Sequence, residues 1–340
     1  MTQSRTRRTS TALAVAGIAV LTMTSCGGAD DAAADDAAGA HEDTGQDYPR
    51  TIENCGQSVT FDAEPERIIL LETAPVTILD GLGLMDRAVA RAGAFPEEYY
   101  DEELYSRIQS IESLSEELDA SGHLMISQEE VVAHDPDLAL GQPDGVSREG
   151  LAPAGISMLI QELYCPEPTV DASYETLYAE IETYGRSSAQ SRRPHELIAE
   201  LDARVEDVAE RAEYEDRTAA VLYPTVGGGS SYAYGSRSMA QPQLEAAGFE
   251  NVFSDTDERV FEVQIEELVD RDPDVLILLY QGDVDGVEET IVELPGAETM
   301  TAVQEEQIHT QLFNFTEPAT PLSVDGLEII SERFQGSGTE

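Results

Sequence analysis

The sequence predicts an α/β protein of two similar lobes, each built on a central parallel sheet, with a single long helix between them. A block that occurs twice is the first reason: MISQEEVVAHDPDLAL fills residues 125–140, and VQIEELVDRDPDVLIL fills residues 263–278. In each copy two glutamates open a short amphipathic helix, Asp-Pro-Asp ends it, and an apolar run typical of a buried parallel strand follows. Strands and helices also alternate along the rest of the chain, as in α/β proteins. Because the copies lie a domain's length apart, we expect two lobes with a ligand cleft between them.

The first lobe is expected to cover residues 51–187. Pro75 suits the first turn of a helix that runs to Leu82. The acidic and aromatic segment 93–105 is interpreted as a surface loop with a short helix. Short apolar runs predict strands at 68–71, 88–92, 138–140 and 156–160.

The connecting helix is expected at residues 188–214, where apolar residues recur at helical spacing from Leu197 to Ala212. The second lobe is expected at 215–335, and it opens with a strand at 219–223 followed by the glycine-rich loop PTVGGGSSYAYGSRS. Further strands are predicted at 275–280 and 309–315, and helices at 241–247, 299–305 and 324–334.

The start of the chain is predicted to be a targeting segment, outside either lobe. Arg5, Arg7 and Arg8 precede an apolar run that is short for a membrane span, and small residues then lead to Cys26. This arrangement resembles a bacterial lipoprotein signal over residues 1–25, with Cys26 as the lipidated first residue of the mature protein. An ordinary secretory signal cut elsewhere is the alternative. Residues 26–50 are small, acidic and poor in large aliphatic side chains, so they predict a flexible tether.

The charge of the chain limits its partners. The formal net charge is −49, and all 19 basic residues are arginine. Such a surface argues against nucleic acid or an anionic membrane face as a partner. It also fits a saline habitat, so the charge says more about environment than about chemistry.

Two cysteines remain after Cys26, and in an exported protein Cys55 and Cys165 are most simply one disulfide. No catalytic or cofactor motif is found. VGGGSS lacks the Gly-Lys-Ser/Thr of a phosphate loop, and no Gly-x-Ser-x-Gly elbow occurs. Acidic pairs are too common in this chain to indicate a glycosidase. The histidines lack metal-ligand spacing, so no metal site is expected: His41, His123, His134, His195 and His309.

These segments, in this order, resemble the substrate-binding proteins of bacterial ABC importers for ferric siderophores and cobalamin, the class III periplasmic binding proteins. The similarity runs from about Glu53 to Phe334. IENCGQSVTF, PERIILLE and LYCPEP are similar to actinobacterial siderophore binders, and SQEEVVAHDPDLAL, AAGFENVF and IEELVDRDPDVLI also match. The resemblance implies two Rossmann-like lobes joined by one long helix, with the ligand between them.

The resemblance also implies that one glutamate on each lobe docks into arginine pockets of a membrane permease. By their place in the repeated block these are Glu129 and Glu266. Two exposed carboxylates on separate lobes could report the spacing of the lobes through charge-assisted pairs. The alternative is that each is only an acid in the first turn of a helix, favoured by the helix dipole.

Ligand contacts are expected from loops at the carboxyl ends of the strands, where open α/β sheets bind. Aromatic faces with a few polar groups suit a bulky ligand, although each aromatic could instead pack within its own lobe. The predicted contacts are Glu72, Thr73, Phe95 and Gln142 in the first lobe, and Tyr232, Tyr234, Arg237, Phe261 and Tyr280 in the second.

The predicted function is that of a lipid-anchored extracytoplasmic binding protein, a monomer without catalysis, that captures a ferric siderophore and delivers it to an ABC permease. Iron enters only as part of the cargo, and no cofactor is expected. Because the candidate loops offer chiefly Arg237 as a cation, a neutral or cationic ferric hydroxamate is favoured over a triply anionic catecholate. The alternatives are cobalamin or haem as cargo, or an exported acidic enzyme.

Overall fold

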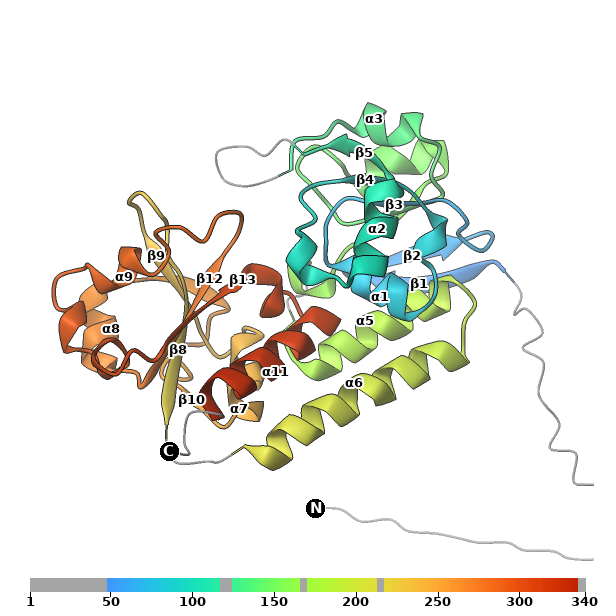
Figure 1. The fold of residues 1–340 in the computed structure, drawn as a ribbon. Helices are drawn as coiled ribbons and strands as arrows, with labels where there is room; N and C mark the ends of the chain where they lie inside the picture. Colours follow the sequence, from blue (N-terminus) through green and yellow to red (C-terminus); the bar gives the residue numbers. More distant parts are fainter. Residues whose placement is uncertain (1–47, 117–123, 166–169, 213–216, 336–340) are drawn as a thin grey trace, which may run out of the picture. The chain divides into compact units, whose positions relative to one another are not determined.

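The computed structural model describes residues 48–116, 124–165, 170–212 and 217–335 (Figure 1). The predicted signal peptide, Cys26 and the tether up to residue 47 lie outside these residues. The predicted end of the tether at residue 50 falls inside the fold, because Arg50 begins strand β1 (Arg50–Asn54). The Tyr48 hydroxyl also donates a hydrogen bond of 2.8 Å to the Ser187 carbonyl.

The first sheet is wholly parallel, as predicted, with the strand order β5-β4-β3-β6-β7. Apolar side chains of its central strands enter a different hydrophobic cluster on each face, which explains their unbroken apolar runs. Edge strand β5 was not predicted, since its residues Glu-Ser-Leu-Ser carry no strand pattern. The strands are β3 (Ile68–Leu70), β4 (Ala88–Ala92), β5 (Glu112–Ser115), β6 (Leu138–Leu140) and β7 (Ser157–Leu159). The helices are α1 (Pro75–Gly81), α2 (Glu102–Ser110), α3 (Gln128–Ala133), α4 (Arg148–Leu151) and α5 (Tyr174–Ser187).

The second sheet is mixed, with the order β11-β9-β8-β12-β13 and β10 beside β8. Strands β8, β10, β12 and β13 are parallel, whereas β9 is antiparallel to both β8 and β11. The second sheet thus has parallel strands, as predicted, with the antiparallel β9 and β11 added at one side. The predicted glycine-rich loop contains β9, because three consecutive glycines with positive φ, Gly227 to Gly229, let the chain reverse. The strands are β8 (Thr218–Tyr223), β9 (Ser231–Tyr234), β10 (Glu250–Asn251), β11 (Val260–Val263), β12 (Val275–Tyr280) and β13 (Ile308–Leu312).

One helix, α6 (Arg192–Arg211), is longer than any other described helix and packs against both α5 and α11 (Figure 1). The two α/β sheets with this long helix confirm the predicted fold class. Arg204 holds α6 to α11 through 2.6 Å contacts with Asp325 and Glu328. The lobe boundaries stay predictions, since residues 43–340 form one compact unit. The remaining helices are α7 (Ala240–Ala246), α8 (Ile265–Arg271), α9 (Glu289–Val292), α10 (Thr301–Gln304) and α11 (Pro321–Gln335). None of the helices in the described part is long and apolar enough to cross a membrane.

The two copies of the repeated block fold alike. Helices α3 and α8 both begin after an extended residue, Ser127 at φ −89° and ψ 150° and Gln264 at φ −92° and ψ 147°. Val131 and Leu268 then occupy the same helical position and are both buried. The repeated sequence therefore specifies the same helix start in each lobe.

The Asp-Pro-Asp corners also have matching geometry. Their first aspartates, Asp135 and Asp272, have positive φ values of 49° and 42°. The carboxylate of Asp137 accepts hydrogen bonds from the backbone N–H groups of Glu66 and Arg67, just before β3. Asp274 accepts one from Thr218 N, at the start of β8. Each corner thus fixes the start of the neighbouring parallel strand.

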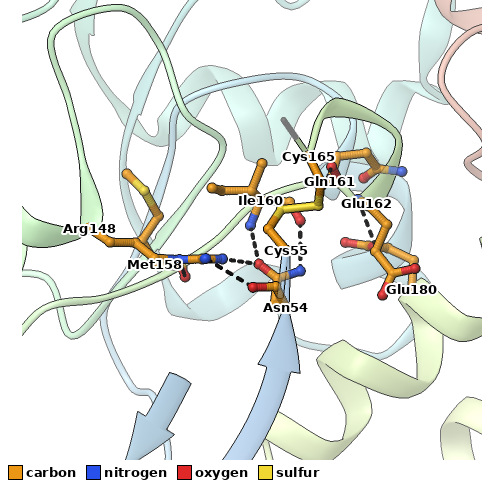
Figure 2. Close-up of a disulfide and its surroundings, with 9 residues drawn as sticks. All are labelled: Asn54, Cys55, Arg148, Met158, Ile160, Gln161, Glu162, Cys165 and Glu180. Carbon is orange, nitrogen blue, oxygen red and sulfur yellow. Dashed lines mark hydrogen bonds between the residues drawn. A yellow bond between two sulfur atoms is a disulfide. The ribbon is translucent and has the colours of Figure 1, made fainter. Parts of the chain in front are cut away.

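A disulfide joins an N-terminal hairpin to the end of the first sheet (Figure 2). Strands β1 and β2 (Gln57–Phe61) are connected by Cys55 and Gly56, whose positive φ values of 53° and 67° suit a two-residue hairpin turn. Cys55 is bonded to Cys165, as predicted, with 5.1 Å between the Cα atoms.

Asn54 ties this hairpin to β7 by hydrogen bonds (Figure 2). Its amide donates to the Ile160 carbonyl (2.8 Å) and accepts from the Ile160 N–H (2.9 Å). Arg148 donates to both the backbone carbonyl and the side-chain oxygen of Asn54. The hairpin is therefore part of the folded body.

Candidate ligand-binding site

The carboxyl ends of the two sheets are connected through Asn314, which follows β13. The Thr73 hydroxyl, after β3, donates a 3.1 Å hydrogen bond to the Asn314 side-chain oxygen. The backbone N–H of Asn314 donates to the hydroxyl of Tyr99, after β4, at 2.9 Å. Farther along, the Gln161 amide donates to the Ala319 carbonyl at 3.1 Å. We call the region where these strand ends meet the junction.

Aromatic rings from both sheets surround the junction. Tyr99 makes an edge-to-face contact with Phe315, with ring centroids 5.2 Å apart. Tyr280, the last residue of β12, packs against the cluster that contains Tyr99. Tyr223, at the end of β8, makes a similar contact with Phe313 at 6.0 Å.

Large apolar side chains are exposed mainly on segments that leave the same strand ends. Five such side chains lie in the described residues: Tyr164, Val226 and Val284 follow β7, β8 and β12, Met125 follows β5, and Tyr232 lies within β9. Tyr232 faces Tyr223 across the pairing of β9 with β8. We expect the exposed apolar side chains at this end of the sheets to contact a ligand.

The cation at the junction is Arg259, which the sequence analysis did not select. Its guanidinium carbon lies 5.9 Å from the centre of the Tyr164 ring, and it donates a 3.2 Å hydrogen bond to Glu317. The predicted Arg237 instead pairs with Asp171 at 2.5 Å. The two arginines are neighbours in the fold, because Arg237 N and Gly235 N donate to the carbonyls of Glu258 and Arg259. That pairing between distant segments has no signal in the sequence.

Glu72 lies at the end of β3 beside the close turn at Gly141. Gly141 has φ +100°, and a Cβ there would lie 2.8 Å from the Glu72 Cγ. The Oε1 atom of Glu72 is buried and has no hydrogen-bond partner. Burial raises the pKa of the Glu72 carboxyl to about 7. Glu72 is therefore an acid that a cation or a hydrogen-bond donor could satisfy.

A second unsatisfied acid, Glu180, lies on α5. Its Oε2 accepts a weak 3.4 Å hydrogen bond from Glu162 N, while its Oε1 has no partner (Figure 2). Burial, and then the charge of Glu162, raises the pKa of Glu180 to about 8. Gln161 Oε1 is also buried without a partner, whereas a side-chain interaction with Tyr184 lowers the pKa of Glu180. The strand ends thus hold several polar atoms that the described residues leave unpaired.

The other predicted ligand contacts are spread over several environments. Phe95 is only 6 % exposed, with the Arg91 guanidinium 5.2 Å from its ring centre, and Tyr99 is equally buried. The segment 93–105 includes the start of helix α2, as expected, but Phe95 and Tyr99 pack into the core instead of lying on the surface. Gln142 is exposed and lines a pocket of about 140 Å³ beside Cys55.

Two predicted aromatics of the second lobe pack within that lobe. Tyr234 is 3 % exposed, and Phe261 makes an edge-to-face contact with Phe253 at 5.3 Å. Of the nine predicted contacts, the structure brings Glu72, Thr73, Tyr232 and Tyr280 to the strand ends around the junction. Their role in binding stays a prediction.

The predicted docking residues occupy equivalent places. Glu129 and Glu266 are both exposed in the first turns of α3 and α8. Neither forms an ion pair with a described residue, whereas the neighbouring Glu267 pairs with Arg271 at 3.1 Å. No group of three His, Cys, Asp or Glu residues in the described ranges could hold a metal ion.

The two α/β sheets, the long helix and the apposed strand ends are typical of a binding protein that holds its ligand between lobes. The family profile for periplasmic binding proteins matches residues 68–311. The chain therefore belongs to the periplasmic binding protein family, whose members are substrate-binding proteins of transport systems.

A solved protein of Saccharomonospora viridis, described as an ABC-type Fe3+-hydroxamate transport system, is 56 % identical to this chain. It has a TM-score of 0.79 and covers 85 % of this chain and 99 % of its own.

More distant solved structures share the fold alone. They include a catecholate-siderophore binding protein of Vibrio cholerae (15 % identity, TM-score 0.64, covering 85 % of this chain and 100 % of that one). Another is a periplasmic heme-binding protein of Roseiflexus (20 % identity, TM-score 0.63, covering 81 % and 99 %). No curated protein matches the chain.

Proposed function

We propose that the protein captures a ferric siderophore of the hydroxamate type outside the cytoplasm and delivers it to an ABC permease. The observation that carries this proposal is the junction, where exposed apolar side chains from both sheets accompany one arginine that is already paired. A triply anionic ferric catecholate would need several converging cations, whereas Arg259 is bonded to Glu317. A neutral or cationic ferric hydroxamate needs fewer. The 56 % identical protein of Saccharomonospora viridis, described as an Fe3+-hydroxamate system, supports the same cargo.

The proposal includes a monomeric protein without catalysis, anchored by a lipid at Cys26 to the outer face of the cell membrane. Iron is then part of the cargo and not a cofactor. The cleft between the lobes holds the ligand, and Tyr232 and Tyr280 contact it from the second sheet.

A fluorescence titration of the mature chain tests the cargo. The probes are ferrioxamine B, a ferric catecholate, cyanocobalamin and haem, with correction for inner-filter absorbance and calorimetry as the second readout. We expect saturable, submicromolar quenching of tyrosine fluorescence by ferrioxamine B alone. Tyr232→Ala should weaken that binding about tenfold, whereas Tyr105→Ala on α2 should not. Tight binding of the catecholate, cobalamin or haem with no hydroxamate binding would overturn the assignment.

Docking to the permease is proposed to use Glu129 and Glu266. The two glutamates occupy matching places in α3 and α8, and neither forms an ion pair with a described residue. Both carboxylates are therefore available for arginines of a partner. The double variant Glu129→Gln with Glu266→Gln should bind ferrioxamine B normally but lose uptake of its iron in cells. Glu130→Gln with Glu267→Gln removes the same charge one residue away and serves as the control. Equal uptake by both double variants would contradict the docking proposal.

A further inference from the structure

Glu72 is an acid whose surroundings supply no positive charge. The titratable groups that interact with it are Tyr164 after β7, and Glu180 and Tyr184 on α5. None of them is cationic. On its remaining side Glu72 contacts the backbone turn at Gly141. No described residue therefore balances a charge on this carboxyl.

The described residues of the wider junction also supply no unpaired positive charge. Arg259 is held by the fully buried Glu317. Beside the exposed face, Glu98 and Asp283 lie close enough to raise the pKa of Tyr280, after the larger effect of burial. An anionic ligand would meet repulsion here, and a cationic one would be attracted.

Burying a polar atom without a partner costs free energy, and burying an unpaired charge costs more. Alongside Glu72 Oε1, a further acceptor on an adjoining segment is buried without a donor, Gln161 Oε1, and Gln161 is 1 % exposed. A protonated amine offers three N–H donors and a positive charge, which is the complement of such a set of acceptors.

We propose that the cargo carries a protonated amine and that the carboxylate of Glu72 binds it. This inference rests on the proposed function and narrows it, from ferric hydroxamates in general to those with a cationic side group. Glu72 is then a specificity residue, while the apolar side chains at the strand ends contact the rest of the complex.

The pairing has a pH dependence that follows from Glu72. Because the pKa of Glu72 is about 7 without a ligand, the carboxyl must lose a proton to pair with an ammonium group at neutral pH. Glu180, with a pKa of about 8, and Tyr184, whose pKa is raised by burial, remain largely uncharged at pH 7. The preference for an amine should therefore increase between pH 6 and pH 8.

The test compares ferrioxamine B, which has a free amine, with its N-acetylated form, which does not. We expect the wild-type protein to bind the free amine about tenfold more tightly at pH 8, and less selectively at pH 6. Glu72→Gln should bring the ratio of the two affinities to about one, mainly by weakening binding of the free amine. Glu250→Gln is the matched control, because Glu250 pairs with the opposite end of β8, at Thr218. It should keep the wild-type ratio.

Equal affinities of the wild-type protein for the two complexes would overturn this inference and leave the proposed function standing. A preference that persists in Glu72→Gln would also overturn it, since the selectivity would then come from elsewhere. Binding of neither complex would overturn both proposals. Thermal unfolding of Glu72→Gln at pH 8 shows that the variant is folded and keeps these outcomes distinct.

Discussion

Two acids near the junction, the fully buried Glu317 and the half-buried Glu72, have opposite surroundings. Glu317 is 0 % exposed and accepts hydrogen bonds from Met239 N at 2.8 Å and from Arg259 at 3.2 Å. Burial raises its pKa, but Arg259 and the Met239 N–H oppose that effect. Burial likewise raises the pKa of Glu72, and nothing opposes it. The fold supplies partners to Glu317 and leaves Glu72 Oε1 without one, so the two acids should respond in opposite directions to mutation.

The largest effect is expected from Glu317→Ala. The substitution leaves the half-buried Arg259 guanidinium and the Met239 N–H without an acceptor, which should lower the free energy of unfolding by about 3 kcal/mol. Urea denaturation at pH 7 measures it. Glu258→Ala, at an exposed neighbour of Arg259, should change stability by less than about 0.5 kcal/mol. A decrease of less than about 1 kcal/mol in the free energy of unfolding of Glu317→Ala would mean that the Glu317–Arg259 pair contributes little to stability.

Glu72→Gln should act in the opposite direction. The pKa of the Glu72 carboxyl is raised from 4.5 to about 7 in the folded state. Ionised Glu72 therefore lowers the free energy of unfolding most above pH 7. Below pH 4.5 Glu72 is protonated in both the folded and the unfolded state. The free energy of unfolding then falls as the pH rises from 4.5 to 7. The variant should therefore be no more stable at pH 4 but more stable by about 2 kcal/mol at pH 8, after allowance for partial exposure. Equal gains at both pH values would show that titration of Glu72 is not the cause.

Gly141→Ala should have a smaller effect and reveals how firmly Glu72 is held. An alanine at φ +100° is strained, and its Cβ would press on Glu72 Cγ, so we expect a loss of about 1 to 2 kcal/mol. In a Glu72→Ala background the contact disappears, and the loss should fall by about 0.5 kcal/mol. A double-mutant cycle of unfolding free energies measures this coupling. No coupling would mean that Glu72 moves freely away from the turn.

The smallest effect is expected for acids that are neither buried nor paired within the described chain. Glu129→Gln and Glu266→Gln should each change the free energy of unfolding by less than about 0.5 kcal/mol, since each loses only a first-turn helix dipole interaction. Thermal unfolding at low and high salt checks this. A loss above 1 kcal/mol at either position would indicate a structural role in place of a docking role.

Elements with a strong local pattern were predictable from the sequence. The strands expected at 88–92 and 275–280 coincide with β4 and β12, because unbroken apolar runs specify central parallel strands. The repeated block predicted two similar lobes because each of its copies ends in such an apolar run. Strand β5 was missed because its edge position tolerates polar residues, and β9 because glycine and serine precede it.

The candidate site was predictable only in part. Position after a strand was enough to select Glu72, Thr73 and Tyr280. It was not enough to choose Arg259 over Arg237, because that choice depends on β11 pairing with β9. Nor could sequence alone distinguish an aromatic at a binding face from one in a core, as Tyr232 and Tyr234 illustrate two positions apart.

The disulfide has a mechanical consequence for a protein proposed to be held by its N-terminus. A pull on the segment before Arg50 would pass along β1 to Cys55 and across the sulfur–sulfur bond to Cys165. Cys165 precedes α5, and the strands of the first sheet all lie within the loop that the bond closes, between two cysteines 110 positions apart. Part of any tension on the anchor would thus pass through covalent bonds to α5, and not through the strand ends that are proposed to hold the ligand.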